Sequence, residues 1–409
     1  MKVKSRIVKV HDQEFIIHEV SSRLSFVSVL RRTIHRLRTL FKSIANFSGS
    51  IFSEIRVRTI KKYLKNKRAL NESDNSEVIQ ANRVTRNTKA KYDKINFVYR
   101  NPSSIHSPYV YFRGLKTALE RNGLLYYSYD VSGSERLDIN ALLKYPILCI
   151  TGSWEPVFNV VQLVNGRQFT AEINSESLHT WQGDMDDIYY DLVRDRSNYF
   201  DMYFTGAEID LDSYFGKLCY WMPSWAHVEL LDDISPPVYD KLGFIGHVVG
   251  REEFFAKDKN KTILLANTVP RKDALENVIE LCKLINKFRI LVTPMGVRFM
   301  GMTGKTYEYM ACKRLCLCYL NEDYMFKTKL LFQDGQNIVF FKTFEEMEEK
   351  YRHYIRNQEA ADRIALAGYY KVRAFHNADV RAKRFAELVL HHANGGKYDR
   401  ALNDVSAFL

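Results

Sequence analysis

Glycine, lysine and glutamate residues gather in one short stretch, Gly301–Lys313, in a spacing that suits a phosphorylated ligand. A loop there leads into a predicted short helix whose first turn carries Lys305 and Thr306. Backbone N–H groups at a helix start favour anions, and a lysine beside them adds a positive charge. Glu308 follows Lys305 by three residues, so both side chains share one face, where the carboxylate can accept hydrogen bonds from a ribose diol. An ordinary capped helix with a Lys–Glu pair fits the same residues, and both interpretations stay open.

A basic pair, Arg271 and Lys272, opens the helix that is predicted to follow the strand Thr262–Ala266. Cations are less expected than acidic residues at a helix start, because the helix dipole is positive there. The pair is therefore a candidate for a second phosphate clamp, since arginine can bind a phosphate through two parallel hydrogen bonds. A solvated helix start is the alternative interpretation.

Two histidines lie in loops that follow predicted strands. His106 follows the first strand, Ile95–Tyr99, and His179 lies in the polar loop after the strand Phe169–Ile173. Either side chain can act as a general base if its neutral form is favoured near pH 7. Each can equally be a simple exposed loop histidine.

The acidic run Asp184–Asp187 imitates a D-x-D metal signature. It precedes a predicted helix near Ile188–Val193, where acidic side chains stabilise the helix start. We interpret the run as a cap and expect no metal and no cofactor, with Asp184 kept as a candidate base.

Two common nucleotide motifs are missing from the sequence. Neither predicted half has G-x-G-x-x-G after its first strand, and G-x-x-x-x-G-K-[ST] occurs nowhere. These absences count against a dinucleotide-dependent enzyme and against a P-loop NTPase.

The stretch Gly301–Lys313, with the apolar strand after it, resembles the donor-nucleotide motif of GT-B glycosyltransferases, G-x-x-x-K-x-x-E-Y-x-A-x-[GK]. The following Leu331–Phe340 resembles the Phe-x-Asp-Gly loop and strand of the spore-maturation-type (CgeB-like) group. The likeness extends over about residues 240–392. It is loose over residues 94–235 and absent over residues 1–92.

This resemblance implies a role for each matched residue. Glu308 would hold the ribose, Gly304, Lys305 and Thr306 would meet the diphosphate, and Gly246 would let the backbone approach it closely. Many retaining members carry a second glutamate where this sequence has Met300, which leaves the stereochemical outcome open.

The elements that must position these residues alternate between strand and helix from Lys94 onward. Such alternation predicts parallel βαβ units with helices on both faces of each sheet. The alternation of strands and helices is interrupted around Ser235–Pro237, and a second series begins after it. We therefore predict an α/β protein with two Rossmann-like, doubly wound domains that face a cleft. By the resemblance, residues 93–235 form the acceptor domain, and residues 236–409 form the nucleotide-sugar donor domain with a helical tail.

The first 92 residues differ in composition from the rest. They carry a net charge of +14, whereas the remaining 317 residues carry −2. Apolar residues recur at helical spacing from Ser22 to about Ile55, and a polar run near Asn71–Glu77 resembles a linker. We predict a basic amphipathic helical segment that binds an anionic membrane surface or packs on the body or a second subunit. Nucleic-acid binding ranks last, because few aromatic residues lie among the basic ones.

The function implied is transfer of a sugar from a nucleoside-diphosphate sugar to a glycan, lipid-linked or protein acceptor near the cytoplasmic membrane face. The sequence has no run of about 18 apolar residues and no secretory signal, so we expect a cytoplasmic protein, peripheral at most. The six cysteines occupy apolar contexts and are expected to be buried thiols. A catalytically silent GT-B-like scaffold and a nucleic-acid-associated basic protein are the alternatives.

Deletion of residues 1–70 should leave a soluble body that still binds nucleotide, because the strand–helix series begins only at about Lys94. Binding to anionic lipid vesicles should disappear with the segment, and binding by the intact chain should weaken as salt is added. Vesicle co-sedimentation of both forms checks this. If the intact chain ignores anionic vesicles, a packing or oligomer role replaces the membrane role.

Overall fold

The computed structural model describes most of the chain after residue 90 and a short part before it. The described residues are 4–10, 13–19, 91–99, 107–131, 133–150, 155–174, 199–206, 218–227, 236–246, 251–260, 262–266, 278–294, 302–322, 325–398, 401 and 405–408.

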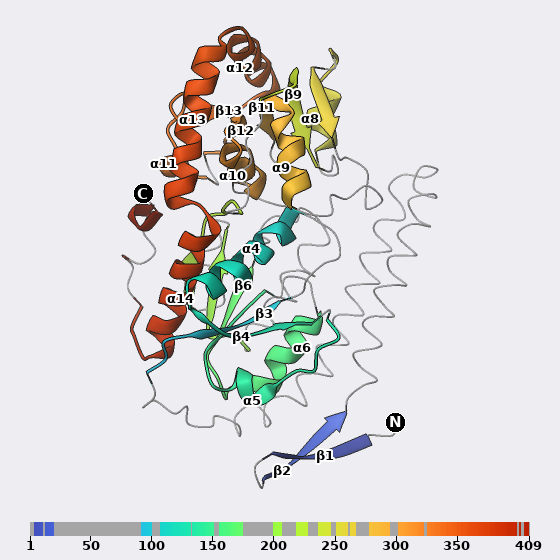
Figure 1. Cartoon of the computed structure of the whole chain (residues 1–409), viewed down its shortest axis with the longest axis vertical. Coiled ribbons are helices and arrows are strands. Elements are labelled where there is room, and N and C mark those ends of the chain that lie inside the picture. The colour runs from blue at the N-terminus through green and yellow to red at the C-terminus, as the bar shows by residue number, and fades with distance from the viewer. Residues whose placement is uncertain are drawn as a thin grey trace, which may run out of the picture. The chain divides into compact units, whose positions relative to one another are not determined.

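The first domain is built on a sheet of six parallel strands (Figure 1). Its order is β4-β3-β5-β6-β7-β8, and helices α4 (Ser107–Arg121), α5 (Ile139–Leu142) and α6 (Glu155–Val164) connect its earlier strands. Strand β3 is buried along its whole length, as expected for a parallel strand that is covered on both faces. The strands are β3 (Ile95–Tyr99), β4 (Leu125–Asp130), β5 (Ile147–Cys149), β6 (Thr170–Asn174), β7 (Met202–Thr205) and β8 (Leu218–Trp221).

The second domain has a sheet of five parallel strands in the order β10-β9-β11-β12-β13. The strands are β9 (Tyr239–Ile245), β10 (Ile263–Ala266), β11 (Phe288–Thr293), β12 (Leu315–Tyr319) and β13 (Val339–Phe341). Its helices include α8 (Glu252–Ala256), α9 (Val278–Asn286), α10 (Gly304–Ala311) and α11 (Thr328–Leu331).

The strand order reverses once in each sheet. The chain moves outward from β3 to β4 and then returns to the other side with β5, and it does the same with β9, β10 and β11. In doubly wound sheets, ligands bind outside the carboxyl ends of the strands at this reversal. The prediction of two Rossmann-like domains is confirmed, and the reversal between β9 and β11 marks where a ligand of the second domain belongs.

The C-terminal helices are divided between the two domains, whereas the sequence predicted that all of them belong to the second. Helices α12 (Phe344–Arg356) and α13 (Gln358–Phe375) pack on the second domain, but α14 (Ala378–Ala393) packs against α4 of the first domain (Figure 1). Phe385 of α14 meets Phe204 of β7 edge to face, with ring centroids 4.7 Å apart. The expectation that residues 236–409 form one domain therefore needs a correction, because α14 completes the first domain.

Residues 1–81 form a compact unit of their own, separate from residues 82–409. Its described part is an antiparallel hairpin of β1 (Lys4–Val10) and β2 (Gln13–Glu19). The helical interpretation of residues 1–92 is wrong for this part, where Ile16 pairs with Ile7 and Phe15 pairs with Val8 across the two strands. The helix expected from Ser22 to Ile55 lies outside the described residues.

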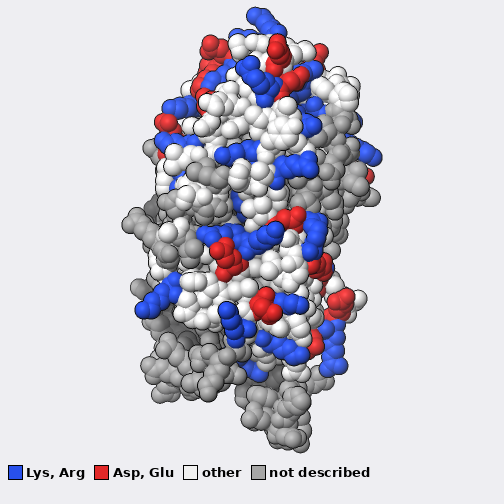
Figure 2. Space-filling model, turned by 60° about the vertical axis from the view of Figure 1, so that its left-hand side comes forward, with Lys and Arg blue, Asp and Glu red and all other residues white. Residues whose placement is uncertain are grey.

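The surface charges and the cysteines of the described residues are as the composition predicts. Figure 2 shows Lys and Arg side chains interspersed with Asp and Glu on the face in view. All six cysteines are free and buried, as expected. Within the described residues, no helix is both long and apolar enough to cross a bilayer.

Candidate functional site

Gly246 and Lys305 lie in direct contact at the reversal of the second sheet. Gly246 directly follows β9, and Lys305 is in the first turn of α10. A Cβ atom added to Gly246 would overlap Lys305 Nζ and lie 2.9 Å from its Cε. The φ of Gly246 is 134°, a conformation that L side chains rarely adopt, so the backbone here favours glycine. Two residues that the sequence singled out separately are thus brought together.

Tyr309 fixes this contact from inside the second domain. Its hydroxyl accepts a hydrogen bond from Ile245 N (3.2 Å) and donates one to Ile245 O (3.4 Å). The side chain is fully buried, and burial raises the pKa of Tyr309 well above its ordinary value. A permanently protonated hydroxyl therefore ties α10 to the last residue of β9, which explains why a tyrosine follows the glutamate in the motif.

Thr306 has a different role from the one expected. Its hydroxyl lies 3.0 Å from Thr293 Oγ1 on β11, and the residue has no exposed surface. Its backbone N–H donates to Thr303 O at 3.0 Å. The side chain that we expected at a diphosphate therefore fastens α10 to the end of β11. Thr303 occupies the N-cap position of α10, and its hydroxyl is buried without a hydrogen-bond partner in the described part of the structure.

The motif also ends for a structural reason. Lys313, just after α10, has a φ of 52°, in the left-handed region. The N–H of Arg314 donates to Tyr309 O at 3.0 Å and closes the helix end. Glycine adopts that conformation most easily, which agrees with the glycine that the motif allows at its last position.

Lys305 and Glu308 share one side of α10, and their environment perturbs the lysine. Glu308 is only 3% exposed, and Lys305 is half-buried. Burial lowers the pKa of Lys305 to about 8, with Glu308 opposing the shift and Arg251 adding to it. At neutral pH the amine is still charged in a poorly solvated place, which favours an anionic partner.

Arg251 is a further cation of this site that the sequence analysis missed. It precedes α8, donates from Nε to Pro294 O (3.4 Å) just after β11, and lies 5.8 Å from the ring centroid of Phe244. Burial lowers its pKa, while Tyr309 and Glu252 oppose that shift. The signal in the sequence was a single basic residue five positions after Gly246, which is a weaker pattern than the adjacent pair Arg271 and Lys272. Lys305 and Arg251 thus bring two positive charges to this site, beside the carboxylates of Glu308 and Glu252.

The remaining predicted residues fall outside the described residues. These are His106, His179, Asp184, Arg271 and Lys272. His106 follows β3, whose carboxyl end lies at the reversal of the first sheet, so its place in the chain suits a functional loop. In the described residues, no group of three or more His, Cys, Asp or Glu side chains could hold a metal, and the run Asp184–Asp187 is not among them.

One family model matches part of this chain. Residues 241–387 match the family model described as glycosyl transferase-like, which covers β9 to α14 and includes the site. We found no match among curated proteins.

Three solved structures are similar to this chain. The Anabaena protein HepE in complex with UDP-glucose has a TM-score of 0.50 at 10% identity, over 72% of this chain and 99% of that chain. An alpha-glucosyltransferase in complex with UDP has a TM-score of 0.50 at 8% identity, over 72% and 99%. A trehalose-phosphate synthase from Burkholderia xenovorans has a TM-score of 0.48 at 10% identity, over 72% and 99%. The first two likenesses establish that this chain shares their fold.

The opposite charges of Glu308 and Arg251, which both act on Lys305, predict opposite pKa shifts in two variants. Arg251→Gln should raise the pKa of Lys305 because it removes a like charge, and Glu308→Gln should lower it because it removes an attractive one. An NMR titration of carbon-labelled lysine side chains measures both shifts, with the exposed Lys259 as a reference residue. A Lys305 that titrates above pH 10 in all three proteins would contradict the geometry.

Proposed function

We propose that this chain, a nucleotide-sugar-dependent glycosyltransferase with the GT-B fold, binds the diphosphate of its donor between Gly246, Arg251 and Lys305. The observation that carries the proposal is the contact of Gly246 with Lys305 at the strand reversal. A backbone without a Cβ atom, a half-buried amine and a helix start meet there, and each favours an anion. Known proteins with this fold include ones solved with UDP and UDP-glucose, which supports a nucleoside diphosphate as that anion.

Glu308 is the residue that we assign to the ribose. It lies one helical turn from Lys305 and is almost wholly buried. A buried carboxylate can accept hydrogen bonds from both hydroxyls of a ribose, and these charge-assisted bonds are stronger than neutral ones. A diphosphate at Lys305 and a ribose at Glu308 would place the nucleoside along α10.

In the proposed reaction, the bond between the sugar's anomeric carbon and the diphosphate oxygen breaks, and a bond from an acceptor hydroxyl oxygen to that carbon forms. The electron pair of the broken bond stays on the diphosphate, and the acceptor's proton passes to a base. Lys305, Arg251 and the start of α10 stabilise the charge that develops on the departing diphosphate. His106, His179 and Asp184 remain the candidates for the base, and Arg271 with Lys272 remain candidates for a further phosphate contact.

The acceptor in this proposal is a glycan, a lipid-linked sugar or a protein, held by the first domain. The basic N-terminal segment supports work at an anionic membrane surface, since residues 1–92 carry +14 while the rest is close to neutral. A second subunit is the other partner that this segment could contact.

Glu308→Ala should weaken nucleotide binding by about 1.5–3 kcal/mol, roughly a ten- to hundredfold rise in Kd, because hydrogen bonds to a charged acceptor are lost. Calorimetry with a panel of nucleoside diphosphates first identifies the base that the unmodified chain binds. The same titration then compares Glu308→Ala with Glu308→Gln, which keeps the side-chain shape, and with the control Glu345→Ala on the exposed face of α12.

The same titration also separates the two basic candidates. Arg251→Gln should weaken binding of the diphosphate while the free nucleoside is unaffected, since its charge lies beside Lys305. Arg271→Gln tests the earlier candidate in the same way. Unchanged affinity in a folded Glu308→Ala variant, together with an unchanged Arg251→Gln variant, would refute the site.

Transfer should survive EDTA, because Lys305, Arg251 and the start of α10 supply the positive charge for the diphosphate. The run Asp184–Asp187 belongs to the other half of the chain, and alternate side chains at a helix start point in different directions. The measurement is activity with EDTA against activity with added manganese. Loss of activity in EDTA, rescue by manganese, and loss of that rescue in Asp184→Asn and Asp186→Asn would establish a metal site there.

A further inference from the structure

The chain crosses between its two domains at the junction of α13 and α14, residues Phe375–Ala378. Before the junction, α13 packs against α10 and β12 of the second domain. After it, α14 packs against α4, with an ion pair from Arg121 to Asp379. The junction is therefore the point where the chain returns to the first domain.

The other crossing is fastened to this one. The segment after β8 leads from the first domain towards the second, and its Ala226 N donates to His376 O at 2.9 Å. Ala378 N in turn donates to Ala226 O at 3.0 Å. The two connections between the domains are thus held together by backbone hydrogen bonds.

Arg381 is the side chain that binds both connections at once. It has no exposed surface, and it donates from Nε to Pro223 O (2.9 Å) and from Nη1 to Phe375 O (3.0 Å). Its guanidinium lies 4.9 Å from the ring centroid of Phe408. Burial lowers the pKa of Arg381 to about 10, so it remains charged at neutral pH. A buried cation is tolerated when each of its N–H groups finds an acceptor, and the planar fork of arginine meets several at fixed angles.

His376 connects Arg381 to the donor-binding helix. Its Nδ1 lies 2.7 Å from Arg381 Nη2, which can only donate, so Nδ1 accepts and the neutral ring carries its proton on Nε2. Burial, with the charges of Arg381 and Lys371, holds the pKa of His376 well below its ordinary value. The ring packs edge to face on Tyr307, with centroids 5.6 Å apart, and lies 5.1 Å from Phe332.

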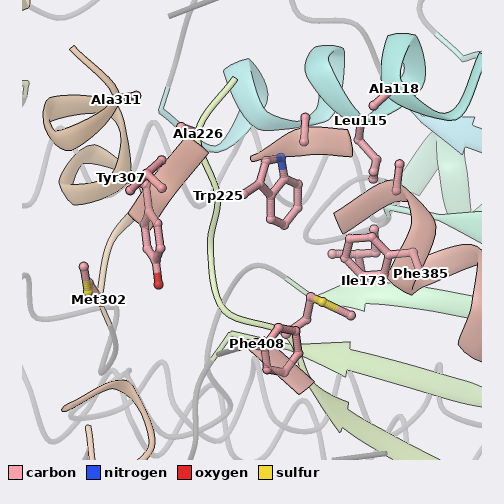
Figure 3. Close-up of a cluster of buried hydrophobic side chains, with 14 of the residues drawn as sticks. Leu115, Ala118, Ile173, Trp225, Ala226, Met302, Tyr307, Ala311, Phe385 and Phe408 are labelled. Carbon is pink, nitrogen blue, oxygen red and sulfur yellow. The ribbon is translucent and has the colours of Figure 1, made fainter. Parts of the chain in front are cut away.

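Tyr307 lies on the side of α10 that faces away from Lys305. Two residues correspond to about 200° around a helix, so Tyr307 and Lys305 project to nearly opposite sides. Figure 3 shows the Tyr307 ring extending from α10 beside the segment that carries Trp225 and Ala226. Its phenol is also close enough to Arg381 to raise the pKa of that guanidinium. One side of the helix therefore meets the proposed ligand, and the other rests on the domain crossing.

We propose that Arg381 and His376 are positioning residues for the donor: they fix the Tyr307 side of α10 to the domain crossing and so set nucleotide affinity without touching the nucleotide. This inference rests on the proposed donor site at Lys305 and Glu308. It predicts that changes at Arg381 and His376 lower nucleotide affinity, which a role in stability alone would not do.

The test compares the affinity of the full chain for the nucleoside diphosphate UDP, by calorimetry, in variants that fold. Arg381→Lys keeps the charge but loses the planar fork, and His376→Phe keeps the ring packing but removes the Nδ1 acceptor. Each should raise the Kd about tenfold, with a matching rise in KM for the donor and a smaller change in kcat. Tyr307→Phe should raise the Kd less, and combined with Arg381→Lys it should add nothing further, because both act through one contact.

Two controls separate this role from general stability. Arg373→Lys makes the same substitution at an exposed position of α13 and should leave the Kd within twofold. Phe204→Leu loosens the packing of β7 on Phe385 of α14, so it lowers the unfolding temperature but should keep the Kd. Equal weakening by Phe204→Leu and Arg381→Lys would overturn the inference. If Arg381→Lys does not fold, an unchanged Kd in both His376→Phe and Tyr307→Phe overturns it. An unmodified chain that binds no nucleoside diphosphate refutes the proposed function itself, before any variant is measured.

Discussion

The structure depends on how firmly α10 is held, because this helix carries both a half-buried cation and a buried carboxylate. Three side chains in consecutive or near positions fasten it in three directions: Thr306 to β11, Tyr309 to β9, and Tyr307 to the α13–α14 junction. All three anchors are fully buried, and the hydroxyls of Thr306 and Tyr309 cannot rotate away without losing their hydrogen bonds. A short helix of eight residues would be marginal alone, and here its orientation comes entirely from tertiary contacts.

That rigid support makes the charge arrangement possible. The charge of Arg251 contributes to the lowered pKa of Lys305, while Glu308 opposes that shift; burial lowers the pKa of Arg251, while Tyr309 and Glu252 oppose it. Like charges in a poorly solvated place cost stability, and proteins keep such arrangements where a ligand relieves them. A diphosphate brings the missing negative charge to that place, so the same repulsion that strains the free protein would favour binding. Gly246 contributes because it has no Cβ atom, so the amine of Lys305 can lie against its backbone.

The sequence predicted the parts of this site that follow from local spacing. Alternating strands and helices predicted two doubly wound domains, and the three-residue separation of Lys305 from Glu308 placed them on one helical face. The sequence did not show what the Thr306 hydroxyl binds. A threonine in the first turn of a helix can bind a phosphate, and it can equally form a hydrogen bond to a neighbouring buried strand. The sequence singled out Arg271 and Lys272, which lie outside the described residues, and it did not single out Arg251, because one arginine in a loop is a weak pattern. Only the packing of Arg251 against Pro294 and Phe244 identifies it.

The return of α14 could not be predicted for a more general reason. Helical periodicity shows that one face of residues 378–393 is apolar, but both sheets offer an apolar surface, and the sequence does not say which one is covered. Two residues direct α14 to the first domain. Arg381 donates a hydrogen bond to Pro223 O in the segment after β8, and Asn377 caps the start of α14. Because α10 also contacts α4 of the first domain, the donor helix touches both domains and their crossing. The helix that we propose for the donor therefore lies against the domain that we propose for the acceptor, and a transfer reaction needs such a relation because its two reacting atoms must meet within about 3–3.5 Å.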